Sequence, residues 1–113
     1  MSWGQNKYNN RITYIDGIRF SSQKEATRYA SLKLLERAGV IKNLKLQPRF
    51  TLQEPFICDG KKERKIEYVA DFAYTENGRE IVEDVKGEKT QVYKLKRKLF
   101  LFRYGDKVTF REV

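Results

Sequence analysis

The sequence predicts one α/β (α+β) domain in which two main helices flank a mixed central β-sheet. Short apolar runs with period-two alternation, separated by turn residues, indicate strands on both sides of a first helix and again at the end of the chain. Two stretches, residues 23–38 and the segment from Thr90 onward, carry helical signals instead. A chain of 113 residues with 40% hydrophobic residues is long enough to bury a core as a single domain, residues 1–113.

The N-terminal part of the chain predicts an arm, a hairpin and a helix. Residues 1–10 are polar and Asn-rich, so we expect a flexible arm there. Residues 11–15 and 18–20 flank Asp16-Gly17, a pair that suits a two-residue hairpin turn. Ser22 and Glu25 have the spacing of a capping box, and Gly39 provides a stop signal, which together predict a helix over residues 23–38.

The apolar residues of this helix do not form one clean stripe. Ala26, Tyr29 and Leu32 share a side, and Glu25 lies on the same stripe because it precedes Tyr29 by one turn. Leu34 points elsewhere, which suggests packing on more than one face.

The remaining chain reads as strands, a basic helix and a closing strand. We expect strands over residues 40–46, 49–57, 65–74 and 80–86, with a break at Gln47-Pro48, a turn at residues 59–62 and a hairpin turn at residues 76–78. From Thr90 the period becomes helical: apolar residues recur at Val92, Leu95, Leu99 and Phe102, with lysine and arginine on other faces. Residues 107–113 alternate again as a final strand.

Composition limits the classes of function. There are 24 Lys and Arg against 15 Asp and Glu, a formal net charge of +9, and such a balance attracts polyanions, with nucleic acid as the leading partner. No segment approaches the ~20 apolar residues of a membrane span. With Cys58 as the only cysteine, no disulfide framework is predicted, and we expect a cytoplasmic protein, in the host cell if a phage encodes it. Because histidine is absent, hydrolysis would depend on carboxylates, lysine and a hard cation.

Acidic residues within apolar runs are the main candidates for chemistry. If a two-residue Asn77-Gly78 turn joins the strands on either side of it, Asp71 lies opposite Asp84 on the same face. Lys86 shares the face of Asp84 because side chains alternate. Two such acids could share one Mg²⁺ or Mn²⁺ ion, with Lys86 orienting a water or stabilising developing charge. The alternative is an ordinary surface ion pair between Asp84 and Lys86.

Five segments taken in order carry a family resemblance. They are residues 20–26, 41–48, 68–72, 83–87 and 93–98, with the sequences FSSQKEA, IKNLKLQP, YVADF, EDVKG and YKLKRK. The sequence resembles the PD-(D/E)XK nuclease superfamily, and within it a group of small phage-encoded domains similar to transposon end-cleaving endonucleases. The resemblance covers roughly residues 18–100.

The resemblance implies a restriction-endonuclease-like core and assigns roles to single residues. Asp71 and Asp84 would be metal ligands, Lys86 the catalytic lysine, and Glu25 of the first helix a further ligand, with Gln47 at the edge of the site. Ala70 stands where the superfamily name expects proline. Three alternatives stay open: Glu83 in place of Asp84, a purely capping role for Glu25, and a structural hydrogen bond for Gln47.

Basic residues near these acids are candidates for contacts with DNA phosphates. They form two clusters, Lys61, Lys62, Arg64 and Lys65 in one and Lys94, Lys96, Arg97 and Lys98 in the other. Solvated faces are the alternative interpretation of both clusters. Tyr93 is expected to close the core rather than stack on a base, and Trp3 and Tyr8 of the N-terminal arm are weak candidates for DNA contact.

Three functions fit these observations. The first is a Mg²⁺-dependent DNA endonuclease of phage recombination or replication, with branched DNA as a candidate substrate. The second is a DNA-binding accessory protein that retains the fold without cutting, and the third is a structural protein of a phage particle. A homodimer is one expected state, because cutting two strands requires two sites.

Overall fold

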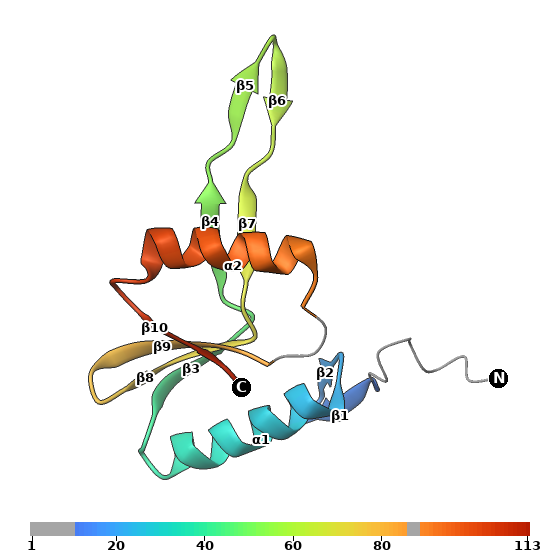
Figure 1. Ribbon diagram of the computed structural model, residues 1–113. Helices are drawn as coiled ribbons and strands as arrows, with labels where there is room; N and C mark the ends of the chain where they lie inside the picture. The colour runs from blue at the N-terminus through green and yellow to red at the C-terminus, as the bar shows by residue number, and fades with distance from the viewer. Residues whose placement is uncertain (1–10, 86–88) are drawn as a thin grey trace, which may run out of the picture.

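The computed structural model describes residues 11–85 and 89–113 and shows a mixed α+β fold (Figure 1). The predicted flexible arm, residues 1–10, lies outside the described residues, as does Lys86. The N-terminal hairpin is confirmed as β1 (Thr13–Ile15) and β2 (Ile18–Phe20), which pair antiparallel around Asp16-Gly17. Both turn residues have positive φ, as this turn requires.

Helix α1 (Gln23–Arg37) is also confirmed, and its start has the predicted cap. The Ser22 side chain accepts a hydrogen bond from the backbone N–H of Glu25. Ala26, Tyr29 and Leu32 are buried, whereas Leu34 is 63% exposed. The expectation that α1 packs on more than one face is therefore wrong, because one stripe faces the sheet and the side with Leu34 faces solvent.

A four-stranded mixed sheet forms the centre of the fold, in the order β10-β9-β8-β3. Its strands are β3 (Lys42–Leu46), β8 (Phe72–Glu76), β9 (Arg79–Asp84) and β10 (Thr109–Glu112). Strand β9 pairs antiparallel with β8 and parallel with β10. The predicted Asn77-Gly78 turn gives the register that the sequence indicated, with Glu76 opposite Arg79 and Thr75 opposite Glu80.

The two helices cover opposite faces of this sheet. Phe72, Tyr74 and Ile81 pack with the buried stripe of α1 in one core cluster. Ala73 and Val82, whose side chains point to the other face, pack with Phe100 of α2 (Gln91–Tyr104) in a second cluster. In the described part of the chain, neither helix is long and apolar enough to cross a bilayer.

Two predicted strands are each divided in two. Residues 49–57 form β4 (Arg49–Gln53) and β5 (Phe56–Cys58), and the interruption includes Pro55, which has no N–H to donate. Residues 65–74 form β7 (Ile66–Val69) and β8, which belong to different sheets. The prediction of one strand is wrong here because the Ala70 N–H bonds to the Pro48 carbonyl and the Asp71 N–H bonds to Glu83, so the chain crosses from one sheet to another.

A long hairpin projects from the domain (Figure 1). Strand β4 pairs with β7, and both strands pack against α2. Farther from the domain, β5 pairs with β6 (Lys61–Glu63). The Asp59-Gly60 turn is confirmed, but Lys61 and Lys62 belong to β6 rather than to the turn.

The helical period predicted for α2 from Val92, Leu95, Leu99 and Phe102 is correct. All four of these side chains are nevertheless exposed, and α2 buries a different face.

Core packing by α1 leads to a first prediction. Leu32→Ala should lower the free energy of unfolding by about 2–5 kcal/mol, because Leu32 is fully buried and truncation leaves a cavity. Leu34→Ala, the same change two residues later on the exposed side, should stay within about 0.5 kcal/mol of wild type. Urea unfolding of both variants measures the difference, and equal losses would show that α1 packs differently.

Candidate active site

Asp71 and Asp84 come together where β8 and β9 meet the crossover from β7. Asp71 directly precedes β8 and Asp84 is the last residue of β9, so the β8–β9 register places them across from each other. The Asp84 carboxyl is close enough to raise the pKa of Asp71 through hydrogen bonding and charge. The predicted juxtaposition of the two acids is therefore present, although Asp71 lies just outside its strand.

Backbone contacts fix the position of Asp71. Its N–H donates to the Glu83 carbonyl at 3.1 Å, and its own carbonyl accepts from the Gln47 N–H at 2.9 Å. Its carboxylate Oδ2 accepts from the Val85 N–H at 2.7 Å. These bonds tie the acid to β9 and to the β3–β4 connection.

Asp84 is held from the opposite side by an aromatic hydroxyl. It is 7% exposed, and the Tyr68 hydroxyl donates to its Oδ2 atom. Burial raises the pKa of the Tyr68 hydroxyl, and the hydrogen bond to Asp84 raises it further, so Tyr68 remains a proton donor to this carboxylate. The role of Tyr68 was not predictable from the sequence, because the single long strand predicted over residues 65–74 gave no reason for its side chain to point at Asp84.

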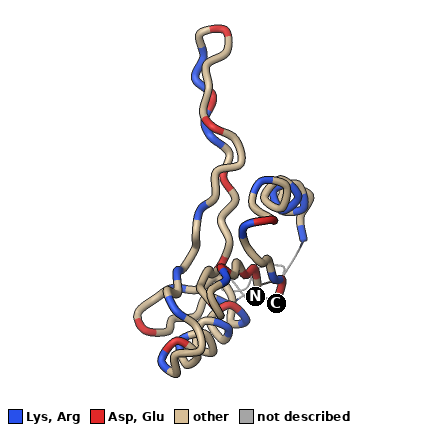
Figure 2. The backbone as a smooth tube through the Cα atoms, turned by 90° about the vertical axis from the view of Figure 1, so that its left-hand side faces the viewer, with Lys and Arg blue, Asp and Glu red and all other residues tan. Residues whose placement is uncertain are grey.

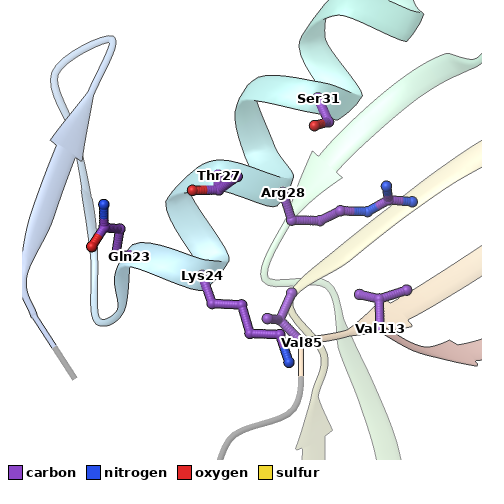
Figure 3. A pocket seen from close by; sticks show the side chains of 7 residues that line it. All are labelled: Gln23, Lys24, Thr27, Arg28, Ser31, Val85 and Val113. Atoms are coloured by element: carbon purple, nitrogen blue, oxygen red, sulfur yellow. The ribbon is translucent and has the colours of Figure 1, made fainter. Parts of the chain in front are cut away.

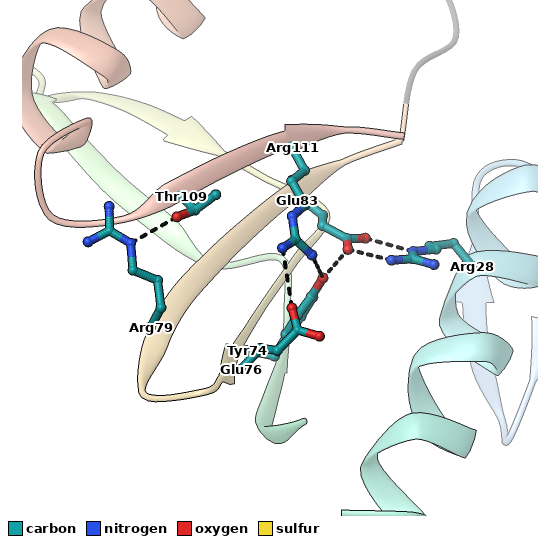
Figure 4. Close-up of polar contacts among 7 residues, drawn as sticks. All are labelled: Arg28, Tyr74, Glu76, Arg79, Glu83, Thr109 and Arg111. Carbon is teal, nitrogen blue, oxygen red and sulfur yellow. Dashed lines mark hydrogen bonds and ion pairs between the residues drawn. The ribbon is translucent and has the colours of Figure 1, made fainter. Parts of the chain in front are cut away.

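Glu83 is not free to join the pair. It is fully buried on the α1 face of β9, where Arg28 donates to it through Nε at 2.8 Å and Nη2 at 2.6 Å. The Tyr74 hydroxyl donates to the same carboxylate, and Arg111 approaches that hydroxyl at 3.3 Å (Figure 4). Alternation along β9 thus directs Glu83 to α1 and Asp84 to the opposite face.

This network also connects the site to α1. Hydrogen bonding to Glu83 raises the pKa of Arg28, and burial together with Glu83 raises the pKa of Tyr74 to about 12. Arg28 lies three residues after Glu25, on a neighbouring position of the same helix face. The ion pair therefore fixes the distance between Glu25 and β9. This ion pair was not predicted from the sequence, although an arginine beside the buried stripe of α1 was a usable signal for a buried acidic partner.

A small cavity beside the acids contains further predicted residues. It has a volume of about 140 Å³, and Glu25, Gln47 and Asp71 line it together with Ile18, Arg19, Phe20 and Leu46. Glu25 is half-buried and accepts a hydrogen bond from Ser21 Oγ at 3.2 Å. Gln47 has a φ of 50°, a left-handed conformation at the turn from β3 to β4, which exposes its side chain at the cavity edge.

A larger cavity of about 480 Å³ lies outside this site (Figure 3). Its walls are one side of the first half of α1 and the ends of β9 and β10, where Val85 and Val113 face Lys24 and Arg28. None of the paired acids lines it. We therefore place the candidate chemistry at the smaller cavity, which Asp71 and Glu25 line.

The carboxyl groups have unusual proton affinities. The pKa of Asp71 is raised to about 8, mainly by burial, then by the hydrogen bond and charge of Asp84. The pKa of Glu25 is raised by burial and by Asp84, against the lowering effect of the Ser21 hydrogen bond. Two carboxyl groups that influence each other in this way are also close enough for a divalent cation to bridge them.

Stability should depend on pH through Asp71 when no metal is present. Because its folded pKa, about 8, lies above the ordinary value of 3.8 for an aspartate, the folded state retains the proton that the unfolded chain loses. Asp71 should therefore make the free energy of unfolding fall as pH rises through this window. Urea unfolding at pH 5 and pH 8 should show this fall in wild type and a smaller one in Asp71→Asn; identical pH profiles would contradict the assignment.

The described residues bring together a pair of acids rather than a full ligand set. Within residues 11–85 and 89–113, no three Asp, Glu, His or Cys side chains lie close enough to form a metal-holding group. Glu25 borders the same cavity as Asp71 and is influenced by the charge of Asp84, so it belongs to the neighbourhood of the pair.

The two predicted basic clusters lie on separate elements (Figure 2). On α2, Lys94, Arg97 and Lys98 line a surface groove of about 640 Å³, and Lys96 is half-buried. Arg97 pairs with Glu112 at 3.3 Å and lies over the Phe110 ring. On the projecting hairpin, Lys61, Lys62 and Arg64 are exposed, and Lys65 pairs with Glu67 at 3.2 Å. Tyr93 packs against the second core cluster and donates to Glu112.

Comparison with protein families gives one match, over residues 5–112, to DUF1064, described as a protein of unknown function. The chain belongs to the DUF1064 family. The match spans nearly the whole chain, including the hairpin and both helices, so the paired acids are part of a DUF1064 domain. Comparison with curated proteins gave no match.

Proposed function

We propose that this DUF1064 domain is a metal-dependent DNA endonuclease with a restriction-endonuclease-like core. The observation that carries the proposal is the meeting of Asp71 and Asp84 at the end of the β8–β9 hairpin, beside a cavity that Glu25 and Gln47 also line. A helix glutamate, a hairpin with two acids and a following basic helix occur in the order of the PD-(D/E)XK signature.

The donor set suits a hard divalent cation. Mg²⁺ is commonly held by one or two carboxylates, with water and substrate phosphate completing its shell, so Asp71 and Asp84 are sufficient protein ligands. Mn²⁺ accepts the same oxygen donors. Glu25 lies where it could contact a water of that shell across the cavity. Lys86 remains in the proposal through its sequence position after Val85, outside the described residues.

Each residue has a defined task in phosphodiester hydrolysis, in which a water oxygen bonds to phosphorus and the bond to a sugar oxygen breaks. A bound cation would polarise the phosphate and lower the pKa of water. The Val85 N–H holds one oxygen of Asp71, and the Tyr68 hydroxyl holds one oxygen of Asp84. These two hydrogen bonds restrict the orientation of both carboxylates. Glu25, whose pKa is raised, is a candidate acceptor for the proton of water.

Helix α2 provides a surface for the DNA backbone. Residues 91–104 contain Lys94, Lys96, Arg97, Lys98 and Arg103 and no acid. Lys94 and Lys98 are exposed one turn apart and line the same groove, so two successive phosphates could contact them. Contacts of this kind position a duplex without reading its sequence.

Salt dependence should reveal these contacts. The double variant Lys94→Ala/Lys98→Ala is expected to weaken binding to duplex DNA and to reduce the slope of log K against log salt by about 0.9 for each phosphate that is no longer neutralised, about 2 in total. Lys42→Ala/Lys45→Ala on β3 removes the same charge far from α2 and should leave the slope nearly unchanged. Equal slopes for both double variants would show that α2 has no special role.

A panel of DNA substrates tests the function itself. Linear, supercoiled, single-stranded and four-way-junction DNA are incubated with protein, with and without Mg²⁺ or Mn²⁺. We expect metal-dependent nicking of at least one substrate, and the pattern defines the preferred DNA shape.

A DNA-binding accessory protein is the second candidate, favoured by the raised pKa of Asp71, because a carboxyl group that retains its proton binds a cation less readily. Binding of duplex or junction DNA without nicking under either metal would support this accessory role. Failure to bind any nucleic acid at low salt would contradict both candidates and leave a structural role.

A further inference from the structure

The outer part of the projecting hairpin is exposed on both of its faces. Residues 54–65, here called the ribbon, contain β5 and β6, and every one of them is exposed. The ribbon extends well beyond α2 and the central sheet (Figure 1). The radius of gyration, 16.3 Å, therefore exceeds the roughly 13 Å of a compact chain of this length. Because an isolated two-stranded hairpin is marginally stable in water, a projecting ribbon of this kind favours a role in contact with a partner.

Positive charge concentrates on the return strand of the ribbon. The outgoing residues 54–58 carry one charge, that of Glu54, and Asp59 at the turn adds a second acid. Residues 61–65 carry a single acid, Glu63, and four cations, namely Lys61, Lys62, Arg64 and Lys65. The formal charge is thus +3 on the return strand and +1 on the whole ribbon. The charged residues follow the outer hairpin in Figure 2. A polyanion would be attracted to one long edge of the ribbon.

The two faces of the ribbon differ in chemistry. Ile57 is the cross-strand partner of Lys62, and Phe56 is the partner of Glu63. Cross-strand partners share a face, and consecutive residues of a strand point to opposite faces. The Ile57 face therefore combines an apolar side chain with a cation and has no acid among the paired residues of β5 and β6. The opposite face carries Glu63, which phosphates would repel.

The ribbon also has dimensions that suit a groove of DNA. The major groove, about 12 Å wide, admits a two-stranded β-ribbon and displays hydrogen-bond acceptors for lysine and thymine methyl groups for apolar side chains. Gly60 at the tip is eleven residues from Asp71, so the tip lies at most about 36 Å from that acid, at ~3.3 Å per residue. One turn of B-DNA spans roughly 34–36 Å. A duplex with a phosphate at the paired acids would thus have a major groove within reach of the ribbon.

We propose that the ribbon enters the major groove of duplex DNA with its Ile57–Lys62 face toward the base edges. This inference rests on the proposed function, which supplies DNA as the partner. Lys62 would donate to guanine O6 or N7, and Ile57 would contact a thymine methyl group. Arg64, farther back along the return strand, would contact a phosphate at the edge of the groove. The ribbon would therefore provide the sequence preference that the phosphate contacts of α2 lack.

Binding of the full chain to DNA in the presence of EDTA tests the proposal without cleavage. Fluorescence anisotropy with a duplex of about 20 base pairs, roughly two turns, should show about tenfold weaker binding by Lys62→Ala. Lys61→Ala is the matched control, because it removes the same charge from the adjacent residue on the opposite face of the ribbon. It should weaken binding by about threefold or less, as expected for a charge outside the groove. Thermal unfolding verifies that both variants are folded.

Two further readouts separate groove recognition from simple charge attraction. Methyl green, which occupies the major groove, should displace wild type from the duplex, and netropsin, which occupies the minor groove, should not. Selection from a pool of random duplexes should yield a sequence preference that Lys62→Ala loses and Lys61→Ala retains. Equal binding by wild type and Lys62→Ala, equal losses in both lysine variants, or displacement by netropsin alone would overturn the proposal.

The same experiment distinguishes this proposal from the nuclease proposal. Wild type that binds duplex DNA through Lys62, yet never nicks it when Mg²⁺ or Mn²⁺ is added, would support the role of the ribbon and contradict the nuclease function. Cleavage by wild type and Lys62→Ala with the same affinity and the same sequence preference would support the nuclease and overturn the role of the ribbon. Failure of wild type to bind any duplex would contradict both.

Discussion

Asp84→Asn is expected to reduce Mg²⁺-dependent DNA cleavage by about three orders of magnitude, which corresponds to about 4 kcal/mol of lost transition-state stabilisation. Asparagine retains the size of the side chain and can still accept the hydrogen bond from Tyr68. It lacks the negative charge that a cation shared with Asp71 requires. Asp71→Asn should have an effect of similar size for the same reason.

Initial rates of plasmid nicking at saturating DNA measure this loss. Glu80→Gln is the matched control, because Glu80 lies on the same strand and is exposed, so its loss of one charge should leave the rate within a factor of two or so. Unfolding curves of the variants exclude simple misfolding. Cleavage by Asp84→Asn at the wild-type rate would remove Asp84 from the mechanism.

Arg28→Ala is expected to lower the free energy of unfolding by about 3 kcal/mol, the low end for breaking a buried ion pair. The value is at the low end because Arg28 keeps 29% of its side chain exposed, whereas Glu83 is fully buried. The variant leaves the Glu83 carboxylate with only the Tyr74 hydroxyl as a side-chain donor in the described network. Urea unfolding measures the loss, and Arg37→Ala in the last turn of α1 is the control with the same charge change.

The double variant Arg28→Met/Glu83→Leu should recover much of this stability. Replacing both charges with apolar side chains removes the cost of burying an unpaired carboxylate. If the double variant is as unstable as Arg28→Ala, the loss comes from packing of the arginine stem rather than from the charge. If Arg28→Ala is as stable as wild type, Glu83 does not depend on the ion pair.

The parts of the fold that local chemistry determines were predictable from the sequence. Asp16-Gly17 and Asn77-Gly78 specify hairpin turns, and Ser22 caps α1, so these elements appear where expected. The meeting of Asp71 and Asp84 follows from counting along a hairpin of fixed register. Alternation alone also separates Glu83 from Asp84 by directing them to opposite faces.

Features that depend on long-range contacts were not predictable. The division between β7 and β8 arises because Ala70 and Asp71 bond to Pro48 and Glu83, which are distant in sequence. Nothing local marks that crossover. Tyr68 acquires its role at Asp84 through the same crossover, so its part in the site was hidden as well.

Helix α2 illustrates a second limit, because its helical period was predicted correctly but did not indicate which face of the helix is buried. Val92, Leu95, Leu99 and Phe102 fit helical spacing, but so do Tyr93, Phe100, Leu101 and Tyr104, which the structure packs inward. Periodicity cannot choose between two faces of similar hydrophobicity. The choice depends on partners for the tyrosine hydroxyls, which Glu112 and the Thr51 carbonyl provide.

Calorimetric titration of metal-free protein with Mn²⁺ tests the central claim, that Asp71 and Asp84 together hold a divalent cation. We predict one binding site per chain in wild type, lost in both Asp71→Asn and Asp84→Asn and retained in Glu80→Gln. Absence of any Mn²⁺ site in wild type, or binding by the two aspartate variants as tight as that of wild type, would contradict it.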